Sequence, residues 1–124
     1  MRIDVDDPGV DMDDAQRMLY RGALFSGEVA EYQGGHLISL DEYSGGVLNG
    51  LSREWYQDGT LRSEGVVRDG RAVGEFREWH PSGALKSRKL FDAASASLRE
   101  EDTWDERGAH LTSWRRDDAE RSAQ

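Results

Sequence analysis

This 124-residue chain has no cysteine, only two prolines and no long apolar run. Without cysteine it can form no disulfide, thiolate metal site or thiol nucleophile, so packing and pairing alone must hold its fold. No stretch approaches the ~20 apolar residues that a membrane span needs. The first residues, MRIDVDDPGV, are acidic where a secretion signal is basic. We therefore expect a single-domain cytoplasmic protein that does not bind membranes.

Basic residues are also scarce, since 16 Lys and Arg stand against 25 Asp and Glu, giving a formal net charge of −9. Nucleic-acid binding draws its affinity from Lys and Arg that displace counterions, so we do not expect a nucleic-acid partner. The acidic surplus lies mainly at the two ends of the chain. We interpret the acidic N-terminal segment (1–19) and the charged C-terminal tail (115–124) as solvated flanks. The alternative is that they attract a basic partner electrostatically.

What the sequence does contain is an internal repeat. Residues 50–70 and 74–94 align without a gap, which places Trp55 on Trp79, 24 residues further along. Related copies lie upstream, with Tyr32 at the tryptophan position, and downstream, with Trp104 there and Arg99 replacing the leading glycine. The repeats are predicted at about 22–45, 46–69, 70–92 and 98–114, within one domain that spans 20–114.

Each repeat predicts a β-hairpin, because glycine-containing turns separate short runs of aromatic, charged and β-branched residues. Pro81 and Gly83 suit a three-residue loop, and Gln57-Asp58-Gly59 is expected to turn in the same way. The chain is therefore predicted to be all-β: a single antiparallel β-meander of about eight strands with little helix. Only Asp13–Leu19 and Asp92–Leu98 are open to a short helical turn.

The loops also predict which residues face each other across each hairpin. With three loop residues, Trp55 faces Leu61. The further expected pairs are Glu54 with Arg62, Arg53 with Ser63, Trp79 with Leu85, Glu78 with Lys86 and Arg77 with Ser87. In the outer copies, a two-residue Gly34-Gly35 loop sets Tyr32 opposite Leu37, and a four-residue loop sets Trp104 opposite Leu111.

The stretch NGLSREWYQDGTLRSEGVVRDGRAVGEFREWHPSGALKS has a glycine five residues before an aromatic pair and another glycine three residues after it. It resembles the membrane occupation and recognition nexus (MORN) repeat variant of bacterial proteins, and more narrowly antitoxin-like proteins of the YwqK type. The resemblance extends from about Tyr20 to Phe91. It implies a curved β-meander that acts by protein contact, often as an antitoxin or immunity protein. The acidic balance favours a toxin such as a basic nuclease as its partner.

No pattern of residues predicts an enzyme, a cofactor or a bound metal. His36, His80 and His110 occur singly, and serines such as Ser63 and Ser87 recur at equivalent repeat positions, which indicates packing. The predicted function is therefore non-enzymatic protein binding, with neutralisation of a toxin by direct contact. The alternative is a scaffold that self-associates through open sheet edges.

The candidate partner-binding residues are an aromatic ladder and the polar residues beside it. They are Tyr32, Arg53, Trp55, Tyr56, Arg77, Trp79, His80 and Trp104. Trp, Tyr and Arg dominate protein–protein hot spots, which favours a docking platform. The structural interpretation is a stacked aromatic core with guanidinium groups over the rings. The opposite face, which carries Phe76 and Glu78, is expected to be a mixed polar surface that serves equally well.

Overall fold

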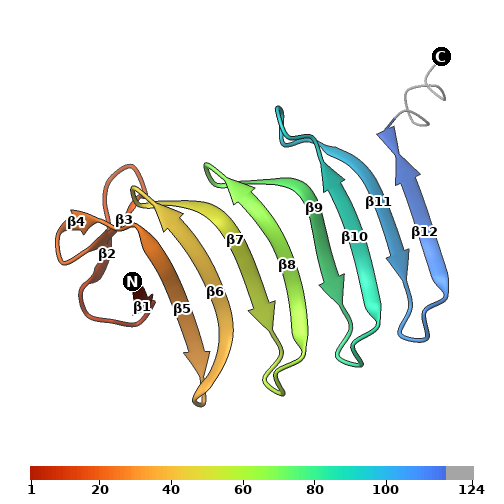
Figure 1. Ribbon diagram of the computed structural model, residues 1–124, viewed down its shortest axis with the longest axis horizontal. Coiled ribbons are helices and arrows are strands. Elements are labelled where there is room, and N and C mark those ends of the chain that lie inside the picture. The colour runs from red at the N-terminus through yellow and green to blue at the C-terminus, as the bar shows by residue number, and fades with distance from the viewer. Residues whose placement is uncertain (117–124) are drawn as a thin grey trace.

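The computed structural model of the chain describes residues 1–116 and consists almost entirely of β-strands (Figure 1). The strands are β1 (Arg2–Asp4), β2 (Val10–Met12), β3 (Met18–Tyr20), β4 (Ala23–Leu24), β5 (Gly27–Gln33), β6 (His36–Ser44), β7 (Val47–Trp55), β8 (Leu61–Arg68), β9 (Arg71–Trp79), β10 (Leu85–Phe91), β11 (Leu98–Trp104) and β12 (His110–Arg115). The all-β class is confirmed, with twelve strands where about eight were expected. Within residues 1–116 there is no helix of the length and hydropathy that a membrane crossing requires.

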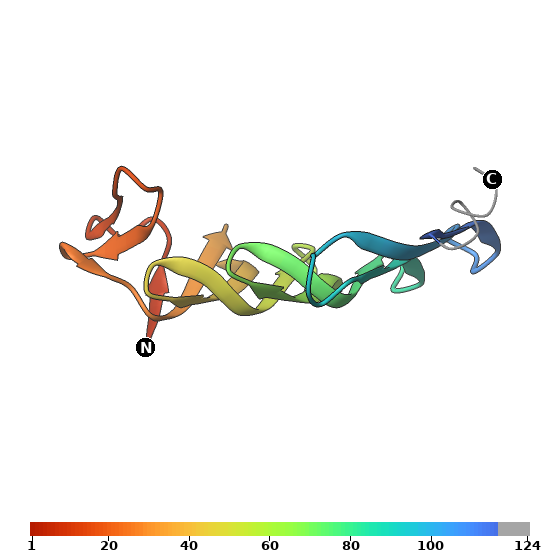
Figure 2. The same ribbon diagram turned by 90° about the horizontal axis from the view of Figure 1, so that it is seen from above.

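Nine of the strands form one sheet in the order β1-β5-β6-β7-β8-β9-β10-β11-β12, so the hairpins stand in a row (Figure 1). The sheet is mixed, because β1 runs parallel to β5 while the strands from β5 onward pair antiparallel. Seen from above, the row is a single layer with the β2–β4 sheet beside its N-terminal end (Figure 2). The accessible surface is 7872 Å², against about 6,700 Å² for a compact protein of this mass. Both faces of most of the sheet are therefore open.

The N-terminal segment 1–19 is not the tail that its acidity suggested, because it forms β1, β2 and β3. Ile3 and Met18, each 5% exposed, pack with Phe25 and Val29 in an apolar cluster that closes this end of the sheet. The aspartates stabilise turns between these short strands. The carboxylate of Asp13, for example, accepts the backbone N–H of Arg17 at 2.8 Å, and this bond is the main reason that the pKa of Asp13 is lowered. The predicted C-terminal tail lies outside the described residues from 117 onward.

The hairpin loops follow one pattern. In the second copy, Tyr56 N–H donates to the Thr60 carbonyl at 2.9 Å and Gly59 N–H donates back to Tyr56, which confirms the three-residue loop. The same two bonds recur at His80 and at Asp105, so the last loop also has three residues, where four were expected. The reason is local, because the Asp105 carboxylate accepts the N–H groups two and four residues further on, each at 2.9 Å.

The predicted aromatic–leucine pairs are confirmed in the first three hairpins, namely Trp55 with Leu61, Trp79 with Leu85 and Tyr32 with Leu37. The pairs predicted beyond them are wrong by one residue, because each hairpin contains a β-bulge. Glu54 faces Ser63, Arg53 faces Glu64, Glu78 faces Ser87 and Arg77 faces Arg88. In the last hairpin Trp104 faces His110 instead of Leu111, because the loop has three residues where four were expected. The bulge leaves Arg62 unpaired in the ladder, where its guanidinium lies over the Tyr56 ring at 5.6 Å from the centroid.

The leading glycine of the repeat marks a second irregularity, at the opposite end of the strands. Gly50 (φ +120°) and Gly74 (φ +69°) lie where the ladder shifts register between β6 and β7 and between β8 and β9. Positive φ is easily accessible only to glycine. Arg99 takes this place in the last hairpin, and its φ is not positive. The arginine is therefore tolerated because its backbone conformation differs there.

A close approach across β8 and β9 generates a stability prediction. Gly65 faces Phe76, and a Cβ at Gly65 would lie 1.9 Å from the ring. We expect Gly65→Ala to lower the free energy of unfolding by about 1–3 kcal/mol, because the ring or the strand must move. Urea denaturation measures this loss. In a Phe76→Ala background the same substitution should be close to neutral, and an equal loss in both backgrounds would contradict the steric explanation.

Candidate functional site

The register divides the side chains of the sheet between two faces. Paired residues share a face and successive residues alternate, so Arg53, Glu64, Arg77, Arg88 and Asp102 form one transverse row. We call the face that carries this row the arginine face. The opposite face, which we call the groove face, carries the alternating row of glutamate and serine or threonine one residue closer to the loops.

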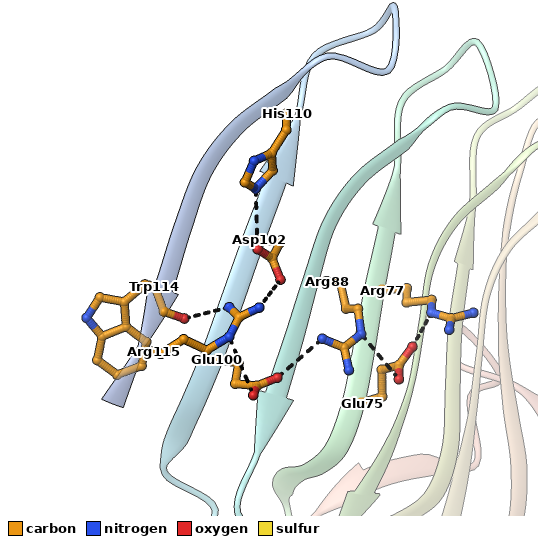
Figure 3. A network of polar contacts seen from close by, with 8 residues as sticks. All are labelled: Glu75, Arg77, Arg88, Glu100, Asp102, His110, Trp114 and Arg115. Carbon is orange, nitrogen blue, oxygen red and sulfur yellow. Dashed lines mark hydrogen bonds and ion pairs between the residues drawn. The ribbon is translucent and has the colours of Figure 1, made fainter. Parts of the chain in front are cut away.

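The arginine face holds one ion pair between β7 and β8 and a separate chain of ion pairs that crosses β9 to β12 (Figure 3). The pairs join Arg53 to Glu64 (3.1 Å), Arg77 and Arg88 to Glu75, Arg88 and Arg115 to Glu100, and Arg115 to Asp102 (3.0 Å). Exposed pairs of this kind each stabilise a fold by only about 0–1 kcal/mol. Their main consequence is electrostatic, because the carboxylates of this network are neutralised within the chain.

Asp102 is the most buried carboxylate of this network. Desolvation raises its pKa, but hydrogen bonds from Arg115, Ser113 and His110 outweigh burial and hold the pKa below its usual value. His110 Nε2 lies 3.3 Å from Asp102 Oδ1, and its ring also packs at a tilt against Trp104. His110 is thus a structural histidine within the last hairpin.

The groove face is hollowed over β5, β6 and β7 by a groove of about 510 Å³. Its lining includes three carboxylates, Glu31, Asp41 and Glu54, together with residues Trp55 and Tyr56. In the described part of the chain, no Lys or Arg lies within ion-pair distance of these three carboxylates. The basic side chain in the lining is Arg62, which lies over the Tyr56 ring. The groove is therefore acidic and has aromatic residues in its lining.

Asp41 is the half-buried carboxylate of the groove. Burial raises its pKa, the hydrogen bond from Ser52 Oγ at 2.5 Å acts in the opposite direction, and the Glu54 charge raises it again. The pKa of Asp41 therefore lies above its ordinary value. A cation placed in the groove would favour the ionised carboxylate, so the site as built is suited to a positively charged group.

A second hollow of about 460 Å³ lies on the same face near Trp104 and Leu111, and two of its carboxylates have a basic partner. Lys89 lies between Glu78 and Glu101, with nitrogen–oxygen distances of 3.6 and 3.8 Å. The groove of β5–β7 differs in that none of its three carboxylates has a basic partner among the described residues. Among residues 1–116, no three His, Asp or Glu side chains converge in a way that would hold a metal ion.

The predicted aromatic ladder is not a stack, so the stacked-core interpretation is wrong. Tyr32, Trp55, Trp79 and Trp104 lie on alternate strands, about 9–10 Å apart, whereas ring pairs need 4.5–7 Å between centroids. A leucine from the intervening strand faces each of the first three rings. Arg53 and Arg77 form ion pairs with Glu64 and Glu75, and in residues 1–116 neither lies over a ring.

Tyr56 and His80, also predicted to bind a partner, connect neighbouring hairpins. Tyr56 Oη donates to the Trp79 carbonyl at 2.7 Å, and His80 Nε2 donates to the Trp104 carbonyl at 2.9 Å. The two residues occupy equivalent repeat positions, so the same type of hydrogen bond joins two successive pairs of hairpins. A partner-binding role for these residues stays a prediction, as it does for the tryptophans, the two arginines and Tyr32, which is 41% exposed.

The groove carboxylates Glu31 and Asp41 were not among the sequence candidates. They lie in the first copy, whereas Glu54, Trp55 and Tyr56 belong to the second. One signal could have identified Glu31, namely a glutamate that faces a serine on the next strand. Glu31 faces Ser39 in the first copy, as Glu54 faces Ser63 in the second. That signal depends on the bulged register, which the loops alone did not predict.

The connection between hairpins generates a second stability prediction. We expect Tyr56→Phe to lower the free energy of unfolding by about 1 kcal/mol, because it leaves the Trp79 carbonyl without its donor. Thermal or urea unfolding measures the change. Tyr32→Phe is the matched control, since the Tyr32 hydroxyl makes no hydrogen bond within residues 1–116, and we expect no change there. Equal effects of the two substitutions would contradict a specific connecting bond.

Asp41 generates a pH prediction. Its folded pKa lies above the ordinary value of 3.8, so the ionised carboxylate destabilises the fold once the pH exceeds that folded pKa. Asp41→Asn keeps an acceptor for Ser52 and should raise the free energy of unfolding at pH 7, with little change at pH 3. Asp6→Asn, at an exposed position, controls for the altered net charge. A gain of equal size at both pH values would refute the assignment.

Comparison of the chain with protein-family models, with curated proteins and with solved structures finds no match. The resemblance of its repeat to the MORN variant therefore stays a prediction, as does the antitoxin role that this resemblance implies. The function must be inferred from the surfaces of the chain itself.

Proposed function

We propose that this chain is a non-enzymatic binding protein that sequesters a basic protein partner, and that the partner is a toxin neutralised by direct contact. The observation that carries the proposal is the acidic groove of β5–β7. Its carboxylates Glu31, Asp41 and Glu54 have no basic partner among the described residues, whereas those of the ion-pair network on the arginine face do.

The electrostatics of the groove favour a cationic side chain from a partner. Asp41 is half-buried and lies near the charge of Glu54, an arrangement that disfavours two ionised carboxylates. An arginine or lysine of the partner would relieve that repulsion and form charge-assisted hydrogen bonds, which are stronger than neutral ones. Arg62, held over Tyr56, leaves the centre of the groove open to such a group.

The walls of the groove suit a protein rather than a small molecule. Trp55 and Tyr56 line it, and these residue types dominate protein–protein hot spots. The groove continues into an open sheet face, and specific complexes bury about 800 Å² on each partner. A single-layer sheet with 7872 Å² of accessible surface offers that area without rearrangement. We therefore place the partner on the groove face.

A basic toxin is the class of partner that best fits the charge of the chain. The net charge of −9 would accelerate association of the chain with a positively charged surface. The acidic chain would then occupy the groove in which a basic toxin binds nucleic acid. The repeat resemblance supports the same role. Nothing in this mechanism needs catalysis by the chain, since masking the active surface of the toxin is sufficient.

The test is co-expression of the chain with the product of the neighbouring gene. We expect a stoichiometric complex that restores growth and weakens with rising salt. The triple variant Glu31→Gln, Asp41→Asn and Glu54→Gln should raise the dissociation constant about tenfold or more, equivalent to about 1.4 kcal/mol. Growth protection should fall in parallel.

The matched control is Asp6→Asn, Asp11→Asn and Asp14→Asn, which removes the same charge from exposed positions outside the groove. This control should bind almost as the unchanged chain does. The proposal fails if no complex forms, or if both triple variants weaken binding equally. Circular dichroism of each variant checks that the sheet is intact.

A further inference from the structure

The two edges of the nine-stranded sheet are built differently. β1 has three residues, and its exposed positions Arg2 and Asp4 are charged. β12 has six residues, lies at the far end of the row, and has no strand on its outer side among residues 1–116 (Figure 1). Natural proteins protect sheet edges with shortness, charge or proline, because an open edge pairs with other strands. β1 has such protection along its whole length, whereas in β12 a charged arginine stands only at the C-terminal end.

The side chains of β12 add to this exposure. Leu111 is 60% and Trp114 is 39% exposed, and between them lie the uncharged Thr112 and Ser113. The bulge at Leu111 lies close to the loop, so the segment 112–115 pairs regularly with β11. The outer side of this segment is therefore a regular ladder edge that can accept another strand.

The charges around β12 disfavour a strongly charged partner strand. Residues 98–116 contain five acidic and four basic side chains and are nearly neutral. The ring of His110 and the guanidinium of Arg115 are already engaged, His110 with Asp102 at 3.3 Å, and Arg115 with Asp102 at 3.0 Å and Glu100 at 3.5 Å. The basic partner proposed for the groove has no electrostatic reason to bind here.

We infer that β12 pairs with β12 of a second copy of this chain, antiparallel and across a twofold axis normal to the sheet. Such an axis keeps the groove faces of the two copies on the same side of the joined sheet. A groove-face residue of one copy must therefore pair with a groove-face residue of the other. One allowed register sets Ser113 opposite itself and Trp114 opposite Thr112 of the second copy, which brings the indole against the threonine methyl group. No like charges then face each other within the strand pair.

The contact is small. Two six-residue strands pair over a length of about 20 Å. The surface area that such a contact buries lies at the low end of the range for specific interfaces. The dimer should therefore be concentration-dependent. It does not depend on the proposed function, because it needs no partner protein.

Sedimentation velocity of the full chain from micromolar to millimolar concentration tests the inference. We expect a shift from monomer to dimer, and Trp114→Lys should raise the dimer dissociation constant at least tenfold. Met12→Lys is the matched control, since Met12 is 52% exposed and lies at the other end of the molecule, and it should leave the dimer intact. A monomer at every concentration would overturn the inference. A dimer equally sensitive to both substitutions would do the same.

Spin labelling locates the contact, because the chain has no cysteine to compete with an introduced one. A label at Ser113→Cys should show dipolar broadening in the concentrated sample, since paired Cα atoms in a β-ladder lie about 5 Å apart. A label at Asp14→Cys should show none. A dimer without broadening at position 113, or one that forms only when a basic protein is added, would overturn the inference.

Discussion

Each hairpin of this chain can be stabilised only by the next hairpin along the row. Within residues 1–116, the β2–β4 sheet and the apolar cluster around Ile3 and Phe25 lie only at the N-terminal end of this single layer. Elsewhere the row relies on ladder hydrogen bonds, aromatic–leucine pairs and the bonds from Tyr56 and His80 to the next copy. Such contacts join nearest neighbours, so the stability of the row accumulates along it, as in other repeat proteins. The same constraint leaves both faces free for function.

The sequence predicted those features that are set within one hairpin. The spacing of Gly59 from Trp55 is local, so the loop and the facing of Trp55 and Leu61 could be derived from turn chemistry alone. The bulge at Arg62 could not, because Arg62 lies over Tyr56, whose hydroxyl binds the Trp79 carbonyl of the next hairpin. One extra residue then changed every predicted pair beyond it, as the period of two in a strand requires.

The acidic N-terminus and the groove were missed for a related reason. Composition treats Asp13 as a solvated charge, although it binds a backbone N–H and supports a turn. The groove draws Glu31 and Asp41 from one copy and Glu54 from the next, so its charge is visible only once the register is known. Repeats show which residues are equivalent. They do not show which residues of different copies lie side by side in the sheet. A binding site on a repeat sheet is formed by such residues.

The positions of the groove and of the β12 edge make the two proposals compatible. The groove lies over β5–β7, and five strands separate β7 from a twofold axis at the outer side of β12. An axis normal to the sheet leaves both grooves facing the same way, so a dimer presents two identical acidic sites on one continuous surface. A partner with two basic regions at a matching separation would then bind both copies, and the second contact would form at a high effective concentration. Weak pairing at β12 would be reinforced by that partner through the same linkage. Self-association and partner binding are therefore expected to strengthen each other when the spacing allows it, and to be independent when it does not.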